Sequence, residues 1–429
     1  MKEAFLTAYR CLDSVFRKRA FSGKELNDAL KNCAEKDRPL VTKLFYGTLD
    51  LSIKYDYVLS LYAKKIKPSV ATALKMGLCA FETLNIPQAA AVNETVALTK
   101  NLGKGGASGF VNAVMRRAVD DLSEGRINFG SDGLEAAALK NGFPLWAARL
   151  IEKDFGSETA KKFVSHRDEE SLGHVRYNPF RTSIRAFEDL LESKGICFKR
   201  GPFQGGYYVK GRLRGVPDDL YTFQSVGSMA VAFACASTNA EKFLDLCAAP
   251  GGKSVLFAQL RPRSEVVSCD VLPHRVELIK KYADRMGTEN VSALQNDAAL
   301  FNPRFENAFD CVLCDVPCSG FGVLSSKPDI KLFKKESDLD ELSALQGGIL
   351  RTAARYVKTG GSLIYSTCTV FKKENDDAVG RFLLENKNFV AEEIRLPFDF
   401  STEKEKFVRF LPFRDGIDGF FIARLKRLG

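Results

Sequence analysis

The chain has 429 residues, 45% of them hydrophobic, and is long enough for two or three domains with separate cores. Its 63 Lys and Arg against 53 Asp and Glu give a formal net charge of +10, which admits a polyanionic partner without requiring one. No apolar run approaches the roughly 20 residues of a membrane span. Charged residues at Lys2, Glu3 and Arg10 also argue against a signal peptide, so we expect a cytoplasmic protein without a membrane anchor.

The cysteines and histidines exclude other classes of protein. Eleven cysteines are scattered, mostly inside apolar runs, whereas disulfide frameworks are typical of much shorter secreted chains. We therefore expect reduced thiols. The spacing of Cys311, Cys314 and Cys318 resembles a metal motif only weakly, because two of the three lie along a predicted strand and no second ligand pair follows. With only three histidines in the chain, no metal site is expected.

Residues 1–125 predict an all-helical bundle. Apolar residues recur at helical spacing from Phe5 to Phe16, and the same pattern recurs at 40–51, 70–84, 90–102 and 110–122. Arg116 and Arg117, near the end of the last pattern, form either a phosphate-binding face or a solvated helix end. A polar, glycine-bearing linker is expected at 123–133.

Residues 134–222 predict a small α+β domain. Helices are expected near 144–155 and 184–194, with a strand at 174–177 and a hairpin around 205–209. Cations and aromatic residues alternate here, which suits stacking on unpaired bases beside phosphate contacts, although an ordinary domain surface explains the mixture equally well. The residues concerned are Arg176, Tyr177, Lys199, Arg200, Tyr207, Tyr208, Lys210, Arg212 and Arg214.

From residue 223 to 429 strands and helices alternate, which predicts a doubly wound parallel sheet. Ligands of such sheets bind at the carboxyl ends of the strands. The expected strands are 243–246, 265–269, 291–295, 309–314 and 362–365, and the expected helices are 253–259, 275–285 and 339–356.

The first three strand ends suggest a nucleoside site. Strand 243–246 leads into a loop of small residues and glycines that lets the backbone approach a ligand closely, but lacks the glycine spacing of a Walker A or dinucleotide motif. Asp270 follows the second strand, where it could accept hydrogen bonds from ribose, and Asn296 and Asp297 follow the third, facing adenine. Each acid alone could be a loop or capping residue, but together they predict S-adenosylmethionine as cofactor. The loop consists of Cys247, Ala248, Ala249, Pro250, Gly251, Gly252 and Lys253.

Two cysteines, Cys318 and Cys368, follow the last two strands. Carbon 5 of a pyrimidine is too weak a nucleophile to take a methyl group directly, whereas a thiolate added to carbon 6 makes carbon 5 an enamine carbon. A base must then remove the carbon 5 proton so that the thiolate can leave. Asp315 is placed to hold the N3/N4 edge of cytosine. The alternative, that a cysteine is a small core residue, is our interpretation of Cys235, Cys269, Cys311 and Cys314.

Several motifs resemble those of the RsmB/Sun/Fmu family of RNA cytosine-5 methyltransferases. They are DLCAAPGGKS (245–254), CDVPCSGFG (314–322), KPDI (327–330), YSTCT (365–369) with Glu374-Asn375, and DGFFIARL (418–425). The stretches FYGTL (45–49), IPQAAAVNE (86–94) and FVNAVMRR (110–117) are similar to the NusB-like domain of that family, and Arg176-Tyr177-Asn178 resembles the R-V-N of its middle domain. The resemblance covers nearly the whole chain.

The resemblance implies a multidomain protein: a NusB-like bundle at 1–125, a small α+β domain at 134–222 and a Rossmann-like methyltransferase domain at 223–429. It implies a nucleophile at Cys368, a product-release cysteine at Cys318, and cofactor contacts at 247–253, Asp270, Asp297 and Asp315. The implied substrate is ribosomal RNA of the small subunit, and we assume a monomer. We expect RNA contacts at Arg116, Arg117, Arg176 and Lys327.

Two other functions stay open at this point. Methylation of an amino group uses an aromatic residue at the end of an acid-Pro-Pro-aromatic motif, and Val316-Pro317-Cys318 departs from that motif. A non-catalytic RNA-binding or ribosome-assembly factor would suit the helical domain and the basic charge, but it does not explain two cysteines at neighbouring strand ends.

Overall fold

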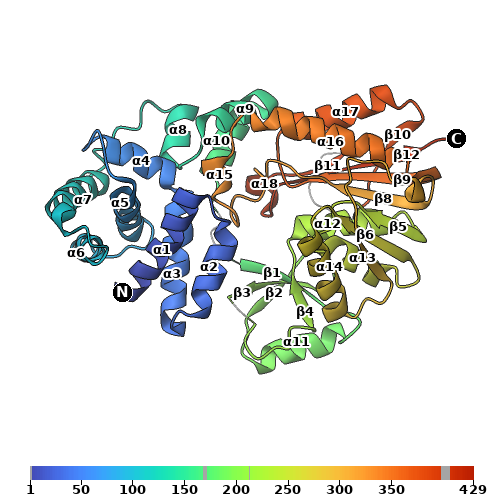
Figure 1. Cartoon of the computed structure of the whole chain (residues 1–429), viewed down its shortest axis with the longest axis horizontal. Coiled ribbons are helices and arrows are strands. Elements are labelled where there is room, and N and C mark those ends of the chain that lie inside the picture. Colours follow the sequence, from blue (N-terminus) through green and yellow to red (C-terminus); the bar gives the residue numbers. More distant parts are fainter. Residues whose placement is uncertain (1, 168–171, 212, 398–405) are drawn as a thin grey trace. The chain divides into compact units, whose positions relative to one another are not determined.

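The computed structural model describes residues 2–167, 172–211, 213–397 and 406–429 (Figure 1). Two compact units make up the chain. The first contains Met1–His166 and Leu324–Lys334, and the second contains Arg167–Val323 and Lys335–Gly429. These bounds differ from those of the predicted domains, because the helices between 134 and 165 belong to the first unit and the small α+β region shares the second unit with the large sheet.

The first unit is helical, as predicted, and helix α5 lies at its centre. α5 is buried on nearly all sides, and its residues contribute to two clusters, one with Ala73 and Met76 and the other with Leu74 and Leu78. A side chain at Gly77 would collide with Thr95 and Met115, so glycine there permits close packing. The helices are α1 (Lys2–Lys18), α2 (Ser22–Lys31), α3 (Arg38–Asp50), α4 (Ser52–Ser60), α5 (Pro68–Glu82), α6 (Gln88–Asn101), α7 (Ser108–Ser123), α8 (Leu134–Lys140), α9 (Leu145–Phe155) and α10 (Ser157–Ser165).

The second unit is built on a mixed sheet in the order β10-β12-β9-β8-β5-β6-β7, with β11 paired to β12. The five predicted strands are present and parallel. The sheet is not purely parallel, however, because β10, β11 and β12 are antiparallel additions that the sequence pattern did not predict. The strands are β5 (Lys242–Asp245), β6 (Glu265–Asp270), β7 (Val291–Gln295), β8 (Phe309–Asp315), β9 (Val357–Thr367), β10 (Phe389–Glu392), β11 (Val408–Phe410) and β12 (Phe420–Arg427).

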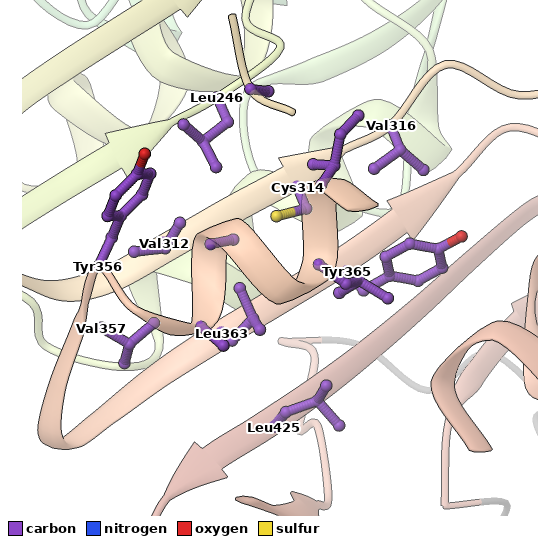
Figure 2. Close-up of a cluster of buried hydrophobic side chains, with 14 of the residues drawn as sticks. Leu246, Val312, Cys314, Val316, Tyr356, Val357, Leu363, Tyr365 and Leu425 are labelled. Atoms are coloured by element: carbon purple, nitrogen blue, oxygen red, sulfur yellow. The ribbon is translucent and has the colours of Figure 1, made fainter. Parts of the chain in front are cut away.

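Helices cover both faces of this sheet. Helices α12 (Val226–Ala236), α13 (Gly252–Leu260) and α14 (Pro273–Met286) lie on one face, and α16 (Asp338–Ala354) and α17 (Asp376–Glu385) on the other (Figure 1). Figure 2 shows part of the core, where Val312 and Cys314 of β8 lie among buried residues such as Leu363 and Tyr365 of β9. Cover on both faces explains the uninterrupted apolar run of β8. Cys235, Cys269, Cys311 and Cys314 are all buried, which confirms that they are core residues.

A small antiparallel sheet precedes the large one and has the order β2-β3-β1-β4. Val175, Tyr207 and Val209 of this sheet pack against Phe187 and Leu191 of the single helix, as expected for a small α+β region. Arg212 lies outside the described residues, as do 168–171. The elements are β1 (Leu172–Tyr177), α11 (Ile184–Ser193), β2 (Phe198–Arg200), β3 (Gly206–Lys210) and β4 (Tyr221–Phe223). In the described part of the chain, no helix is both long and apolar enough to cross a membrane.

The segment Leu324–Lys334 leaves the second unit directly after the Cys318 loop and folds with the helices of the first. Within it, helix α15 (Ile330–Phe333) packs Leu332 and Phe333 against the cluster that contains α1 and α3. The buried Lys331 forms an ion pair with the Asp50 carboxylate and donates to its backbone oxygen at 2.8 Å. Both ends of this segment continue directly into the chain of the second unit.

We predict that Lys331→Met destabilises the first unit by about 2 kcal/mol, because Asp50 loses its charged partner while the aliphatic packing is kept. Urea unfolding followed by fluorescence of Trp146, the only tryptophan and part of α9, measures this change. Lys327→Met, which changes an exposed lysine of the same segment, should leave the midpoint unchanged. Equal effects of both variants would contradict the prediction.

Candidate active site

The two predicted cysteines meet at the carboxyl edge of the large sheet. Strands β8 and β9 are parallel neighbours, and their register aligns Asp315 with Ser366. Cys318 and Cys368 each follow a few residues later, and their Sγ atoms lie 3.3 Å apart. Both residues are partly exposed, unlike the buried cysteines within β8. A partly exposed pair of thiols at this distance can share a proton and can face one substrate.

Two glycines let the surrounding loops approach each other. Gly322 donates its N–H to the Cys368 carbonyl at 2.9 Å, and Gly419 donates to the Gly322 carbonyl at 2.7 Å. A Cβ atom at Gly322 would lie 2.8 Å from the Cys368 carbonyl oxygen and would collide with the backbone of Gly419. The motifs at 314–322 and 418–425 are therefore parts of one packed site, which explains why both contain glycine at these positions.

An ion pair lies beside the cysteines. Lys253, near the start of α13, donates to Asp315 Oδ2 at 2.6 Å, and Ser366 Oγ donates to Asp315 Oδ1 at 2.7 Å. Burial by itself lowers the pKa of Lys253, but the negative charges of Asp315, Asp245 and Cys368 raise it above its usual value. Lys253 therefore stays an ammonium group, and its charge favours a thiolate at Cys368.

Cys318 has different surroundings. The hydrogen bond to Cys368, burial, and the negative charges of Cys368 and Glu374 raise the pKa of the Cys318 thiol well above its usual value. Cys318 therefore retains its proton, whereas the charge of Lys253 favours a thiolate at Cys368. The two sulfur atoms are close together but electrostatically unequal.

The predicted cofactor loop begins at the end of β5. Gly251 has φ = 108°, a left-handed conformation that favours glycine, and it directly precedes α13. Beneath the loop, the buried Asp245 accepts a 2.6 Å hydrogen bond from Ser254 Oγ. Burial and the charge of Asp315 raise the pKa of Asp245 to about 7.

The two predicted acids follow the next two strands. Asp270 is buried at the end of β6, where its carboxylate accepts the N–H of Leu272 at 3.1 Å and pairs with Arg275 at 3.3 Å. Asp297 is exposed and accepts the N–H of Ala299 at 2.9 Å, which is the loop role considered above. Asn296 Nδ2 is buried with no hydrogen-bond partner among the described residues.

A cavity of about 570 Å³ opens beside the loop. Of the predicted cofactor residues, its walls contain Ala248, Ala249, Pro250, Gly252, Lys253 and Asp315. Its remaining walls come from the β4–α12 segment, including Gln224 and Ser228, and from α14, including Tyr282. Cys247, Gly251, Asp270 and Asp297 are not among its lining residues, nor are the two cysteines.

The sequence and the fold can now be compared with those of known proteins. Residues 232–426 match the family model described as 16S rRNA methyltransferase RsmB/F, and residues 3–120 match the NusB family model. The chain is 35% identical over 445 residues to the probable ribosomal RNA small subunit methyltransferase B of Bacillus subtilis (strain 168), and the alignment covers 98% of each chain. The chain belongs to the RsmB/F family of rRNA methyltransferases.

A second RsmB/F relative and a solved structure match this chain over nearly its whole length. Ribosomal RNA small subunit methyltransferase B of Xanthomonas campestris pv. campestris is 29% identical, with 98% of this chain and 96% of the relative covered. The crystal structure of PH0851 superposes with a TM-score of 0.81 at 23% identity and covers 98% of this chain and 99% of that one. The predictions of a NusB-like bundle and a Rossmann-like methyltransferase domain are thereby confirmed.

The predicted RNA contacts divide into two groups. Arg116 and Arg117 on α7 and Lys327 are exposed residues of the first unit. Arg176 is wrongly predicted as a surface contact. It is buried in the second unit, where Nε donates to Gln224 Oε1 at 2.6 Å and Nη1 to Gln259. Its strand, β1, is covered on this face, so Arg176 cannot reach a phosphate from there.

Sequence reasoning missed three residues of the site. Ser366 orients Asp315, and Glu374 and Gln346 form a buried polar cluster behind Cys318. Ser366 and Glu374 lie within the motifs given in the sequence analysis, but their spacing did not indicate which residues they contact. Gln346 lies inside a predicted helix and carried no signal at all.

We predict that Asp245 makes stability depend on pH. Its pKa of about 7 in the folded protein exceeds the usual 3.8, so its contribution is full below about pH 4 and is lost as the pH rises through 7. The loss is on the order of 4 kcal/mol. Asp245→Asn keeps the acceptor for Ser254 without the charge, and should flatten the pH dependence of the unfolding free energy between pH 4 and 7.

Urea unfolding at several pH values measures this effect, with the exposed Asp297→Asn as control. An Asp245→Asn curve parallel to that of the wild type at every pH would contradict the prediction.

Proposed function

We propose that this protein methylates carbon 5 of a cytosine in 16S ribosomal RNA, with S-adenosylmethionine as methyl donor and Cys368 as covalent nucleophile. The observation that supports this most is the 3.3 Å separation of the Cys318 and Cys368 sulfurs beside the Lys253–Asp315 ion pair. Methylation at carbon 5 requires a nucleophile that adds to carbon 6 and a second group that helps to reverse the addition.

In the first step, Cys368 attacks carbon 6 of the pyrimidine. The ammonium group of Lys253 favours the thiolate that is needed for this attack. The new S–C6 bond moves the electrons of the C5–C6 double bond toward carbon 5, which becomes nucleophilic. A cytosine held in a stem must first leave its stack, at a cost of a few kcal/mol.

Asp315 is proposed to orient the base. Its two oxygens are held by Lys253 and Ser366, and its side chain is 24% exposed, so lone pairs are left to accept a hydrogen bond from the cytosine amino group. A carboxylate fixed from behind in this way loses little side-chain freedom when the base arrives.

The residues around the loop fit S-adenosylmethionine. When bound, this cofactor supplies an electrophilic methyl group. The left-handed Gly251 and the small residues from Ala248 to Gly252 let the backbone come close to a ligand, and a cavity of about 570 Å³ adjoins them. Asp270 would hold the ribose, and the side-chain nitrogen of Asn296, which has no partner among the described residues, would meet the acceptor nitrogens of adenine. Asp297 is proposed to assist at the same edge.

In the last step, the carbon 5 proton is lost and the S–C6 bond breaks. Cys318 is proposed to assist this release, because it keeps a proton next to the sulfur that leaves. The exposed Arg116, Arg117 and Lys327 of the helical unit are proposed to contact RNA phosphates. No metal has a role in the proposed reaction, and we assume that the protein acts as a monomer.

We predict opposite effects for the two cysteines. Cys368→Ala should abolish the covalent enzyme–RNA adduct and lower methyl transfer by about 1,000-fold or more, because the nucleophile is lost. Cys318→Ala should still form the adduct but accumulate it. Denaturing gels with radiolabelled 16S RNA and S-adenosylmethionine separate the covalent enzyme–RNA adduct from free RNA and so measure the adduct in each variant.

Cys197→Ala, a change of an exposed cysteine, is the matched control and should behave as the wild type. The reverse pattern would assign the nucleophile to Cys318. Absence of methyl transfer from the wild-type protein to any form of small-subunit RNA would favour a non-catalytic RNA-binding factor.

A further inference from the structure

The buried carboxylate of Glu374 lies behind the Cys318 loop, in the short 3-10 turn Lys372–Glu374. It accepts the backbone N–H of Ser319 at 2.9 Å, the Ser319 hydroxyl, and Gln346 Nε2 at 3.0 Å. Within the described part of the chain it forms no ion pair. A buried carboxylate without a cationic partner is costly unless hydrogen bonds satisfy it, and all three contacts here are donors.

These contacts hold both neighbours of Cys318. Ser319 follows Cys318 directly and is bonded to Glu374 through its backbone and its side chain. Pro317 precedes Cys318, and its carbonyl accepts Gln346 Nε2 at 2.9 Å, from the same amide group that donates to Glu374. The backbone on each side of the cysteine is therefore fixed to one buried polar cluster.

The next residue, Asn375, does the same for Cys368. Its side-chain oxygen accepts Thr367 Oγ1 at 2.6 Å, and its amide donates to the Thr369 carbonyl at 3.0 Å. Thr367 and Thr369 are the two neighbours of Cys368. We call these two sets of contacts the Glu374 bracket and the Asn375 bracket. They are also joined directly, because the hydroxyls of Ser319 and Thr369 lie 2.7 Å apart.

We propose that Glu374 and Asn375 are positioning residues that set the distance between the two sulfur atoms, Glu374 acting through Cys318 and Asn375 through Cys368. The inference rests on the proposed cytosine chemistry. Two adjacent residues on one turn hold two loops that come from different strands, so a displacement of either loop changes the S–S distance.

The distance between the two sulfur atoms matters when the methylated base is released from Cys368. When the S–C6 bond breaks, its electron pair returns to Cys368 Sγ, and the carbon 5 proton passes to solvent water as the C5–C6 double bond forms again. As negative charge develops on Cys368 Sγ, the Cys318 thiol keeps its proton and donates a hydrogen bond to that sulfur, which it reaches only if the sulfurs stay near 3.3 Å. Loss of either bracket should therefore slow release, and loss of the Asn375 bracket should in addition slow attack, because it displaces the nucleophile Cys368 itself.

Full-length Glu374→Ala, Glu374→Gln and Asn375→Ala variants test this division with 16S RNA and S-adenosylmethionine. We expect Glu374→Ala to form the adduct at a rate within about 3-fold of the wild type but to release it about 10-fold or more slowly. Glutamine can accept from Ser319 and Gln346 and donate to the Ser319 hydroxyl, so Glu374→Gln should restore release to within about 3-fold. Asn375→Ala should slow both adduct formation and release about 10-fold.

Asp377→Ala, a change of an exposed acidic residue in the following helix, is the matched control and should leave both rates unchanged. Equal loss of formation and release in Glu374→Ala, or release as fast as in the wild type, would overturn the inference. If Glu374→Ala does not fold, Ser319→Ala and Gln346→Met each remove one side of the Glu374 bracket. If the adduct accumulates in neither of these variants, the inference is overturned.

A second measurement needs no RNA. Alkylation of Cys318 by iodoacetamide, followed by peptide mass spectrometry, should be several-fold faster in Glu374→Ala than in the wild type or Asp377→Ala, because the turn is freed. Unchanged alkylation overturns the positioning role even if methylation of cytosine is established. Conversely, absence of any adduct in the wild type and in Cys318→Ala would refute the proposed function, while alkylation still reports whether Glu374 holds the loop.

Discussion

The parallel pairing of β8 with β9 brings together two sulfur atoms that are 50 residues apart in the chain. Because parallel strands end at the same edge of a sheet, Asp315 and Ser366 come opposite each other, and both cysteine loops begin from aligned positions. β8 lies in the middle of the sheet with helices on both faces, so its position is held by a large buried core. Every proposed catalytic contact depends on this alignment, and a slip of one residue would separate the sulfurs.

The alignment creates proximity, and the charges around it create a difference between the sulfurs. The ammonium group of Lys253 favours negative charge at Cys368, whereas Glu374 disfavours it at Cys318. A low dielectric strengthens both effects because the groups are largely shielded from water. The two thiols thus have different electrostatic surroundings, which suits the proposed reaction with one nucleophile and one hydrogen-bond donor. Lys253 also belongs to the proposed cofactor site, so one side chain would serve both halves of the proposed site.

Prediction from sequence succeeded where the signal was local and failed where it depended on packing. Strand–helix alternation predicted the five parallel strands and hence the edge at which Cys318 and Cys368 lie. It did not predict the antiparallel strands β10 to β12, because the direction of a short strand is decided by its neighbour in the sheet. The mixture of cations and aromatic residues around Arg176 resembled an RNA surface, yet β1 is covered on both faces and Arg176 is buried.

The sequence by itself determined the class of fold, the loop of small residues after β5 and the two cysteines at strand ends, because these follow from periodicity and from residue types at short spacing. The tertiary structure alone decided which distant groups touch. Glu374 and Ser319 are 55 residues apart, and Gln346 lies 28 residues from Glu374 within a helix. A hydrogen bond forms only within about 3 Å, and no local pattern in the chain encodes an approach of that kind across the packed elements of a sheet.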